Sequence, residues 1–249
     1  MASRAGCETV AVVQARMTST RLPGKVMALV LGKPLLGYEL ERIARSVSIS
    51  RIVVATTTNE TDDEVERYVS SIGFGVYRGS ENDVLGRYRE AAAAFGAEAV
   101  VRLTADCPLI DPDVIDLVVG AFLNDGSSPD YASNTLGRRT YPRGLDTEVF
   151  TAEALETSWK RAVLPSEREH VTPYIYNHPE IFKLKGVYND TDMSKYRWTV
   201  DTKEDFTLIK LLIEALYPGN PTFSTNDIIS LMDGNFRLFE VNSHVQQKY

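Results

Sequence analysis

The stretch that decides the fold reads Thr9-Val10-Ala11-Val12-Val13-Gln14-Ala15-Arg16-Met17-Thr18-Ser19-Thr20-Arg21-Leu22-Pro23-Gly24-Lys25. Its first part, Thr9–Gln14, is apolar and predicts a buried strand. Its second part places three cations, Arg16, Arg21 and Lys25, in one short loop. Such a loop cannot pack as a core, because each buried unpaired cation costs several kcal/mol. It makes physical sense if an anion with many oxygens binds there, since arginine forks grip phosphate oxygens in pairs and lysine adds a point charge. A nucleoside triphosphate is the obvious candidate.

This loop differs from the phosphate-binding loop of P-loop nucleotidases. That motif needs two glycines, with Lys and Ser or Thr at fixed spacing. Here Gly24-Lys25 is followed by Val26, and no second glycine stands at the required spacing. Phosphates would therefore be held by side chains and a few backbone N–H groups. The alternative, a solvated turn with scattered charges, fits one arginine better than it fits three cations together.

Short β-rich runs alternate with helical patterns over the first half of the chain. We expect strands at Thr9–Gln14, Arg51–Thr56, Gly75–Tyr77 and Ala99–Leu103, and helices at Pro34–Ser46, Asp62–Ile72 (with Thr61 as N-cap), Asn82–Phe95 and Asp113–Leu123. This alternation predicts an α/β fold, a mostly parallel sheet with helices on both faces. Ligands in such sheets bind beyond the carboxyl ends of the strands, which directs attention to the loops after Val13, Val54 and Leu103.

The pattern changes after Ser128. Strands at Tyr131–Asn134 and Leu145–Phe150 flank a polar connection, Thr135–Gly144, and form an inserted β excursion over residues 131–150. The remaining expected elements are helices at Ala152–Arg161, Glu167–Tyr176, Lys203–Leu216 and Thr225–Met232, and strands at Phe182–Val187 and Tyr196–Val200. Because no internal repeat or linker interrupts the chain, we interpret residues 1–249 as a single domain.

Bulk properties exclude several classes of protein. The 249 residues are 43% hydrophobic and 24% charged, as in an ordinary soluble globular protein. A net charge of −7 argues against general nucleic-acid binding. Cys7 and Cys107 provide neither a disulfide framework nor a metal-binding spacing. Met1–Glu8 lacks the apolar core of a signal peptide, and no apolar run approaches the ~20 residues that span a bilayer. We therefore expect a cytoplasmic enzyme with no membrane or nucleic-acid partner.

Two aspartates at strand ends are candidate metal ligands. Asp106 follows the strand in Arg102-Leu103-Thr104-Ala105-Asp106-Cys107-Pro108-Leu109, and Asp201 follows one in Arg197-Trp198-Thr199-Val200-Asp201-Thr202-Lys203-Glu204-Asp205. Carboxylates at such positions are well placed to hold Mg²⁺ over bound phosphates. The alternatives are an Asp-initiated turn at Asp106 and a helix N-cap at Asp201 or Thr202. Asp111 is expected to cap a helix, because it precedes Pro112.

Further segments carry candidate binding residues for a second substrate. In Pro142-Arg143-Gly144-Leu145-Asp146-Thr147-Glu148, Asp146 and Glu148 are two apart on an expected strand and so face the same side. With Arg143 they suit a hydroxyl-rich or anionic substrate; an exposed edge strand is the alternative. Glu169 and His170 are expected to rim a pocket from a helix, although a lone His is more often structural.

The segment Arg78–Tyr88 follows an expected strand and opens a helix, a suitable place to contact a base or a phosphate. Arg78 and Ser80 are its candidate nucleotide contacts. The alternative is that Ser80 or Asn82 caps the helix.

These segments, in this order, resemble the nucleotide-sugar cytidylyltransferases, which include the acylneuraminate and 3-deoxy-manno-octulosonate cytidylyltransferases. The loop Gln14–Lys25 is specific for the superfamily. The later segments and the tail Asn242-Ser243-His244-Val245-Gln246-Gln247-Lys248 are most similar to the branch named for spore coat polysaccharide biosynthesis protein F. The resemblance covers nearly the whole chain. One departure is Ala105-Asp106-Cys107-Pro108, where the octulosonate enzymes resemble Gly-Asp-Glu-Pro. The Asp and the Pro persist, so the resemblance still implies metal binding there.

The resemblance implies a Rossmann-like nucleotidyltransferase fold of the glycosyltransferase-A type. It also implies Mg²⁺-dependent transfer of CMP from CTP to an acidic sugar, with release of pyrophosphate, for surface polysaccharide biosynthesis. Arg16, Arg21 and Lys25 match the positions that hold the triphosphate. Asp106 and Asp201 match the metal-binding carboxylates.

The same resemblance implies further contacts. Gln14 and Ala15 lie where the backbone approaches the cytosine, and Thr104 joins Arg78 and Ser80 as an expected nucleotide contact. Family dimers often use the β excursion, here Tyr131–Phe150, to cover the partner's site, so a homodimer is expected.

Several alternatives remain open from the residues. A glycosyltransferase that uses a nucleotide sugar shares the fold, but such enzymes usually carry Asp-x-Asp at the metal, and position 108 is Pro. A nucleotide-sensing scaffold would have no reason to keep both Asp106 and Asp201 beside the cationic loop. The acceptor is open among nonulosonates, octulosonates, their amino analogues and phosphonates, whose acid group Arg139, Arg143 or His170 would meet.

Overall fold

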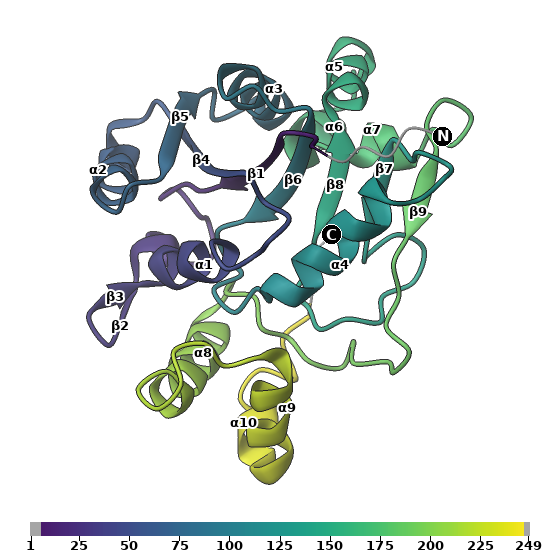
Figure 1. Ribbon diagram of the computed structural model, residues 1–249. Helices are drawn as coiled ribbons and strands as arrows, with labels where there is room; N and C mark the ends of the chain where they lie inside the picture. The colour runs from purple at the N-terminus through teal and green to yellow at the C-terminus, as the bar shows by residue number, and fades with distance from the viewer. Residues whose placement is uncertain (1–5, 247–249) are drawn as a thin grey trace.

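The computed structural model describes residues 6–246, and its centre is a sheet of seven strands in the order β5-β4-β1-β6-β8-β7-β9 (Figure 1). The strands are β1 (Thr9–Gln14), β4 (Arg51–Thr57), β5 (Gly75–Gly79), β6 (Ala99–Thr104), β7 (Tyr131–Ser133), β8 (Glu148–Thr151) and β9 (Leu184–Gly186). β5, β4, β1 and β6 run parallel, β8 is antiparallel to β6 and β7, and β9 is parallel to β7. The predicted mostly parallel α/β sheet is confirmed.

Helices cover both faces of this sheet (Figure 1). Ala11 and Val13 of β1 point into one core with α1 (Leu35–Ile43), α2 (Asp63–Ser71) and α4 (Pro112–Leu123). Val10 and Val12 pack on the other face with α3 (Val84–Ala94), α5 (Ala152–Arg161) and α7 (Pro173–Tyr176). Successive strand residues point to opposite faces, so a strand that is apolar throughout needs helices on both sides.

A third core lies at the end of the molecule where α8 (Lys203–Leu216), α9 (Thr225–Gly234) and α10 (Phe236–Glu240) gather around the fully buried Trp198. The strand predicted at Tyr196–Val200 is wrong, because the backbone of this segment bonds to two separate loops. Trp198 N donates to Arg143 O (2.7 Å), and Val200 N donates to Asp106 O (2.8 Å). These bonds bring Asp201 to the end of β6.

Glycine is required where this segment meets the loop before β8. Gly144 has a φ of 100°, and a Cβ there would stand 2.7 Å from the carbonyl carbon of Trp198. Only glycine combines that backbone conformation with so close an approach.

The carboxyl ends of β1, β4 and β6 lie side by side. Gln14 pairs in register with Ala55 of β4 and with Thr104 of β6. The loops after these strands therefore leave the same edge of the sheet, where ligands of such folds bind.

Most predicted helices are present, with shifted starts. α5 and α8 have the predicted bounds, and Asp111 caps α4 as expected. Thr61 is not the N-cap of α2; Asp62 holds that position, and its buried carboxylate accepts hydrogen bonds from Met17 N (2.8 Å) and Thr57 N (3.1 Å). Asp62 therefore ties the loop after β1 to the end of β4.

The predictions are less accurate for short elements, because a periodic pattern can be recognised only over a longer stretch of sequence. The helix predicted at Glu167–Tyr176 is two helices, α6 (Pro165–His170) and α7, which meet at Val171. The strand predicted at Phe182–Val187 shortens to β9. Elements that were not predicted are the hairpin β2 (Leu29–Val30) and β3 (Lys33–Pro34), the 3₁₀ turns η1 (Lys25–Met27) and η2 (Glu60–Asp62), and α10.

The predicted β excursion, residues 131–150, lies within the central sheet, since β7 and β8 are interior strands. Asn134 closes the connection between them: its Nδ2 donates to Leu145 O (2.7 Å), and its Oδ1 accepts from Thr147 N (2.9 Å). A role for this connection in a dimer stays a prediction. Over residues 6–246, no helix has the length and apolar character needed to cross a membrane.

Candidate functional site

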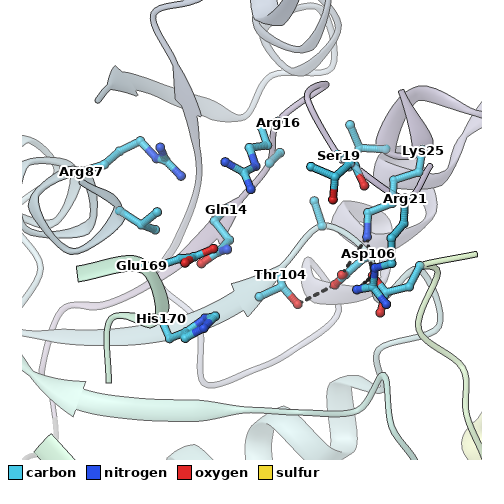
Figure 2. Close-up of a pocket in the computed structure, with 16 residues that line it drawn as sticks. Gln14, Arg16, Ser19, Arg21, Lys25, Arg87, Thr104, Asp106, Glu169 and His170 are labelled. Atoms are coloured by element: carbon cyan, nitrogen blue, oxygen red, sulfur yellow. Dashed lines mark hydrogen bonds and ion pairs between the residues drawn. The ribbon is translucent and has the colours of Figure 1, made fainter. Parts of the chain in front are cut away.

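A pocket of about 320 Å³ opens at the carboxyl ends of β1 and β6 (Figure 2). Its lining combines strand ends, the loop after β1, α3, the end of α6 and the segment before α8. The lining residues are Gln14, Ala15, Arg16, Ser19, Thr20, Arg21, Lys25, Val26, Val84, Arg87, Thr104, Ala105, Asp106, Glu169, His170 and Asp201. The structure thus brings together the predicted cationic loop, both predicted metal carboxylates, and the predicted Gln14, Ala15, Thr104, Glu169 and His170.

The pocket has two chemically distinct ends in Figure 2. We call one the Lys25 end, which consists of Arg21, Lys25, Asp106 and Asp201. We call the other the His170 end, which consists of Gln14, Arg87, Glu169 and His170. Arg16 lies between them.

Lys25 is the centre of its end of the pocket. Its Nζ donates to Asp106 Oδ2 (3.0 Å), Asp201 Oδ1 (2.9 Å) and Val200 O (2.6 Å). Arg21 Nη2 makes a second ion pair with Asp201 Oδ1 at 2.8 Å. Oxygens from the loop after β6 and from the segment before α8 therefore converge on one cation.

The electrostatics keep Lys25 and Asp106 charged. Burial lowers the pKa of Lys25, but Asp106 and Asp201 more than offset it, so this pKa lies above its ordinary value. Burial raises the pKa of Asp106, but Lys25 and the hydroxyl of Thr104 outweigh it, and the net pKa lies below the ordinary range. Both partners are thus ionised at neutral pH.

The oxygens around Lys25 Nζ fit a divalent cation. They are two carboxylates and one carbonyl, the hard oxygen donors that Mg²⁺ and Mn²⁺ prefer. No group of three His, Cys, Asp or Glu side chains suited to a metal occurs within residues 6–246. Two carboxylates suffice for Mg²⁺, which usually keeps waters and takes substrate phosphates as its other ligands. Asp106 and Asp201 are thus the residues that would hold it.

The loop after β1 is held in shape by its own backbone and by two carboxylates. Gly24, with a φ of 72°, donates from its N–H to Met17 O (2.9 Å) and closes the loop. Asp62 binds the loop by accepting the hydrogen bond from Met17 N. Glu81 binds the same loop through an ion pair with Arg16 (3.6 Å) and a hydrogen bond from Thr18 Oγ1 (2.5 Å). The loop that carries the three cations is therefore held in one conformation.

The His170 end depends on a strained turn. Val171 follows α6 with φ 72° and ψ −55°, and Thr172 N donates to His170 O (2.9 Å) across it. This is a γ-turn of the rare positive-φ kind, and a β-branched residue rarely adopts it. Strain of this kind clusters at functional sites. The turn ends α6 so that the exposed Glu169 and His170 face the pocket (Figure 2).

Residues 10–227 match the cytidylyltransferase family. This chain belongs to that family. It is 35% identical over 231 residues to spore coat polysaccharide biosynthesis protein SpsF of Bacillus subtilis, covering 90% of this chain and 93% of that protein. It is 35% identical over 187 residues to 3-deoxy-manno-octulosonate cytidylyltransferase of Chlorobaculum tepidum, covering 71% and 73% of the two chains. A solved cytidylyltransferase structure from Leptospira borgpetersenii superposes with a TM-score of 0.89 at 38% identity, covering 98% of this chain and 99% of that chain. The predicted superfamily and nucleotidyltransferase activity are confirmed.

The sequence prediction for this cytidylyltransferase missed Arg87. The residue is 2% exposed, lines the pocket from α3, and donates from Nη1 to Ser80 O. Asp83 is the N-cap of α3, since its carboxylate accepts from Gly86 N (2.9 Å). Long helical side chains point back toward the helix N-terminus, so a helix that starts after Asp83 aims Arg87 at the pocket.

The pocket lining does not include the predicted nucleotide contacts Arg78 and Ser80. Arg78 forms ion pairs with Asp63 (2.6 Å) and Glu66 (2.7 Å) and ties β5 to α2. Ser80 Oγ accepts from Asp83 N (3.1 Å), so Ser80 supports the turn before α3. Neither Ser80 nor Asn82 is the N-cap itself.

The predicted acceptor residues on and before β8 also lie outside the lining. β8 begins at Glu148, so the expectation that Asp146 and Glu148 share one strand face is wrong. Asp146 pairs with the two terminal guanidinium nitrogens of Arg139, Nη1 and Nη2. Arg143 lines a separate cavity of about 110 Å³ beside the C-terminal segment.

Glu148 is buried and does not line the pocket. Its Oε1 accepts from Tyr131 Oη (2.6 Å) and Thr172 Oγ1 (2.6 Å), and its Oε2 pairs with Arg102. Arg102 Nη2 in turn reaches Gln14 Oε1 at 3.4 Å. Glu148 thus supports Gln14 and the turn that carries His170.

Proposed function

We propose that this cytidylyltransferase transfers CMP from CTP to an acidic sugar, of the nonulosonate or octulosonate type, and releases pyrophosphate. The observation that carries the proposal is the Lys25 end of the pocket. There two carboxylates and two cations meet at the strand ends, beside a third cation, Arg16. Such a set suits a substrate that arrives as a metal–polyphosphate complex.

The residues of this end have separate tasks in the proposed reaction. Arg16, Arg21 and Lys25 bind the phosphates and stabilise the charge that grows on the departing pyrophosphate. Asp106 and Asp201 hold Mg²⁺, which when bound neutralises phosphate oxygens and acidifies the acceptor hydroxyl. Transfer of this kind needs positioning and charge neutralisation more than covalent chemistry. The fixed scaffold of the loop supplies that positioning.

The other end of the pocket serves the base and the acceptor. Gln14 and Ala15 offer amide and backbone groups to the cytosine, with Thr104 beside them. Glu169 and His170 face the acceptor. Similarity to an octulosonate cytidylyltransferase and to a polysaccharide biosynthesis protein supports the choice of an acidic sugar as acceptor. We further propose that the enzyme acts in surface polysaccharide biosynthesis, in the cytoplasm, as a homodimer of single-domain chains, with the β excursion of residues 131–150 covering the partner's site.

The test is a pyrophosphate-release screen that crosses four nucleoside triphosphates with acidic sugars and one phosphonate acceptor. We expect release with CTP and an acidic sugar, its loss with EDTA, and its return with Mg²⁺. Release with CTP and only the phosphonate would move the acceptor to that class. Sugar transfer from a nucleotide sugar without pyrophosphate would overturn the proposal in favour of a glycosyltransferase.

A further inference from the structure

The two oxygens of Asp201 have different partners. Oδ1 faces the pocket and accepts from Lys25 and Arg21. Oδ2 faces away and accepts from Arg197 Nη2 at 3.0 Å. Because Arg197 holds one oxygen, Asp201 presents the other to the pocket as a single, oriented ligand.

Arg197 is itself fixed by a buried carboxylate. Its Nε donates to Asp205 Oδ1 (2.9 Å) and its Nη2 to Asp205 Oδ2 (3.0 Å), a two-point contact that sets the plane of the guanidinium. Asp205 Oδ2 also accepts from the backbone N–H of Asp201 (3.0 Å) and of Thr202 (3.1 Å). One carboxylate at the start of α8 therefore orients both the backbone and, through Arg197, the side chain of Asp201.

The C-terminal segment completes this arrangement. Asn242 follows α10 and is 3% exposed. Its Nδ2 donates to Asp205 Oδ1 (2.9 Å) and to the backbone carbonyl of Arg197 (3.0 Å). A carboxamide nitrogen carries two hydrogens, and Asn242 uses both on the pair that orients Asp201. This gives a role to the tail segment that begins at Asn242.

We propose that Asn242 is a positioning residue for Asp201, so that the C-terminal segment is part of the metal-binding half of the site. Asn242 acts through Asp205 and Arg197, and none of these three residues lines the pocket. The inference rests on the proposed function, in which Asp201 binds the metal. Hydrogen-bond partners of a metal ligand are known to control metal affinity, because they orient the ligand. Arg197 and Asp205 are such partners of Asp201, and Asn242 holds both.

The experiment measures binding of Mn²⁺ alone to the nucleotide-free chain by calorimetry, together with thermal unfolding in EDTA. We expect Asn242→Ala to weaken Mn²⁺ binding about tenfold. Asn242→Ser keeps one donor and should fall between Asn242→Ala and wild type, so the series remains informative if the alanine variant folds poorly. Asn235→Ala, an exposed amide between α9 and α10, is the matched control and should bind Mn²⁺ as the wild type does.

Two outcomes separate this inference from the proposed function. If Asp201→Asn loses Mn²⁺ binding while both Asn242 variants bind as tightly as wild type, the inference is overturned and the metal assignment stands; a lowered unfolding temperature alone would then mark Asn242 as structural. If Asp201→Asn binds Mn²⁺ as tightly as wild type, the metal assignment itself fails, and the inference with it. Graded weakening in the order wild type, serine, alanine supports both.

Discussion

The Lys25 end and the His170 end of one pocket are built in opposite ways. At the Lys25 end, Arg21, Lys25, Asp106 and Asp201 each have an opposite charge at 3.0 Å or less. At the His170 end, Glu169 and His170 are exposed, and in the part of the chain that the structure describes neither side chain has a hydrogen bond or an ion pair. The Lys25 end is organised before any ligand binds, whereas the His170 end adds two free side chains, Glu169 and His170, to the hydrogen-bonded Gln14 and Arg87.

This difference separates the common part of the proposed reaction from the variable part. Every turnover handles the same triphosphate, so its charges gain from partners fixed in advance. Acceptors differ in shape and in the position of their acid group, and exposed side chains adapt to them. Changes at the Lys25 end should therefore lower turnover with every acceptor, whereas the effects of changing Glu169 or His170 should depend on the acceptor.

The largest effect is expected for Asp106→Asn. The amide keeps the shape but removes the charge that pairs with Lys25 and that would hold the metal, so turnover should fall by a factor on the order of 10²–10³. Pyrophosphate release at saturating CTP measures it. Asp113→Asn, which changes an exposed carboxylate on α4, is the control and should leave the rate unchanged. Unaltered CTP consumption in Asp106→Asn would remove Asp106 from the metal site.

Lys25→Met should have opposite effects on catalysis and on metal binding. Loss of a cation from the leaving pyrophosphate should lower turnover roughly 10²-fold. Binding of Mn²⁺ to the nucleotide-free chain should instead tighten several-fold, because the ammonium no longer competes for the oxygens of Asp106 and Asp201. Lys210→Met, on the exposed side of α8, is the control. Weaker Mn²⁺ binding in Lys25→Met would show that the ammonium and the metal do not share those oxygens.

A third prediction concerns Glu39, a buried carboxyl group near Asp106 of the Lys25 end. Glu39 of α1 has no exposed surface, and burial together with nearby Asp106 raises the pKa of its carboxyl well above the ordinary value. Above the ordinary carboxyl pKa, the unfolded chain releases this proton while the folded chain keeps it, so folding stability falls as pH rises toward the folded-state pKa.

Glu39→Gln removes that pH dependence. Its advantage over wild type in free energy of unfolding should grow between pH 5 and pH 8, by up to about 1.4 kcal/mol per pH unit while the folded-state group stays protonated. Urea unfolding at the two pH values measures it. A difference between the two proteins that is the same at both pH values would mean that Glu39 is ionised in the folded chain.

The sequence predicted every residue of the Lys25 end but missed Arg87 at the His170 end, and the difference has physical reasons. The Lys25 end could be predicted because its residues are contiguous in one loop or directly follow a strand, and parallel strand ends meet at one edge. Asp201 does lie at this end, although the segment before it is not a strand. Backbone hydrogen bonds from that segment to the carbonyls of Asp106 and Arg143 fix its position instead.

Two of the residues that sequence reasoning misplaced, Glu148 and Arg78, depend on partners from other elements. Glu148 and Arg78 carry the right chemistry for binding, but Tyr131, Thr172, Asp63 and Glu66 already occupy their polar atoms. A pattern along one strand or helix shows where a side chain points and not which distant group meets it. Arg87, in contrast, becomes predictable once the cap of α3 is placed at Asp83.

The smallest expected effect belongs to the His170 end, and it decides whether the two ends really divide the reaction. His170→Ala should raise the KM for the acceptor about five- to tenfold, the scale of one hydrogen bond of roughly 1 kcal/mol, and should leave the KM for CTP nearly unchanged. Steady-state pyrophosphate release with each substrate varied in turn measures the two constants. His244→Ala, an exposed histidine outside the pocket lining, is the control. If both constants rise together, His170 contacts the donor, and the exposed side chains of the His170 end do not serve the acceptor alone.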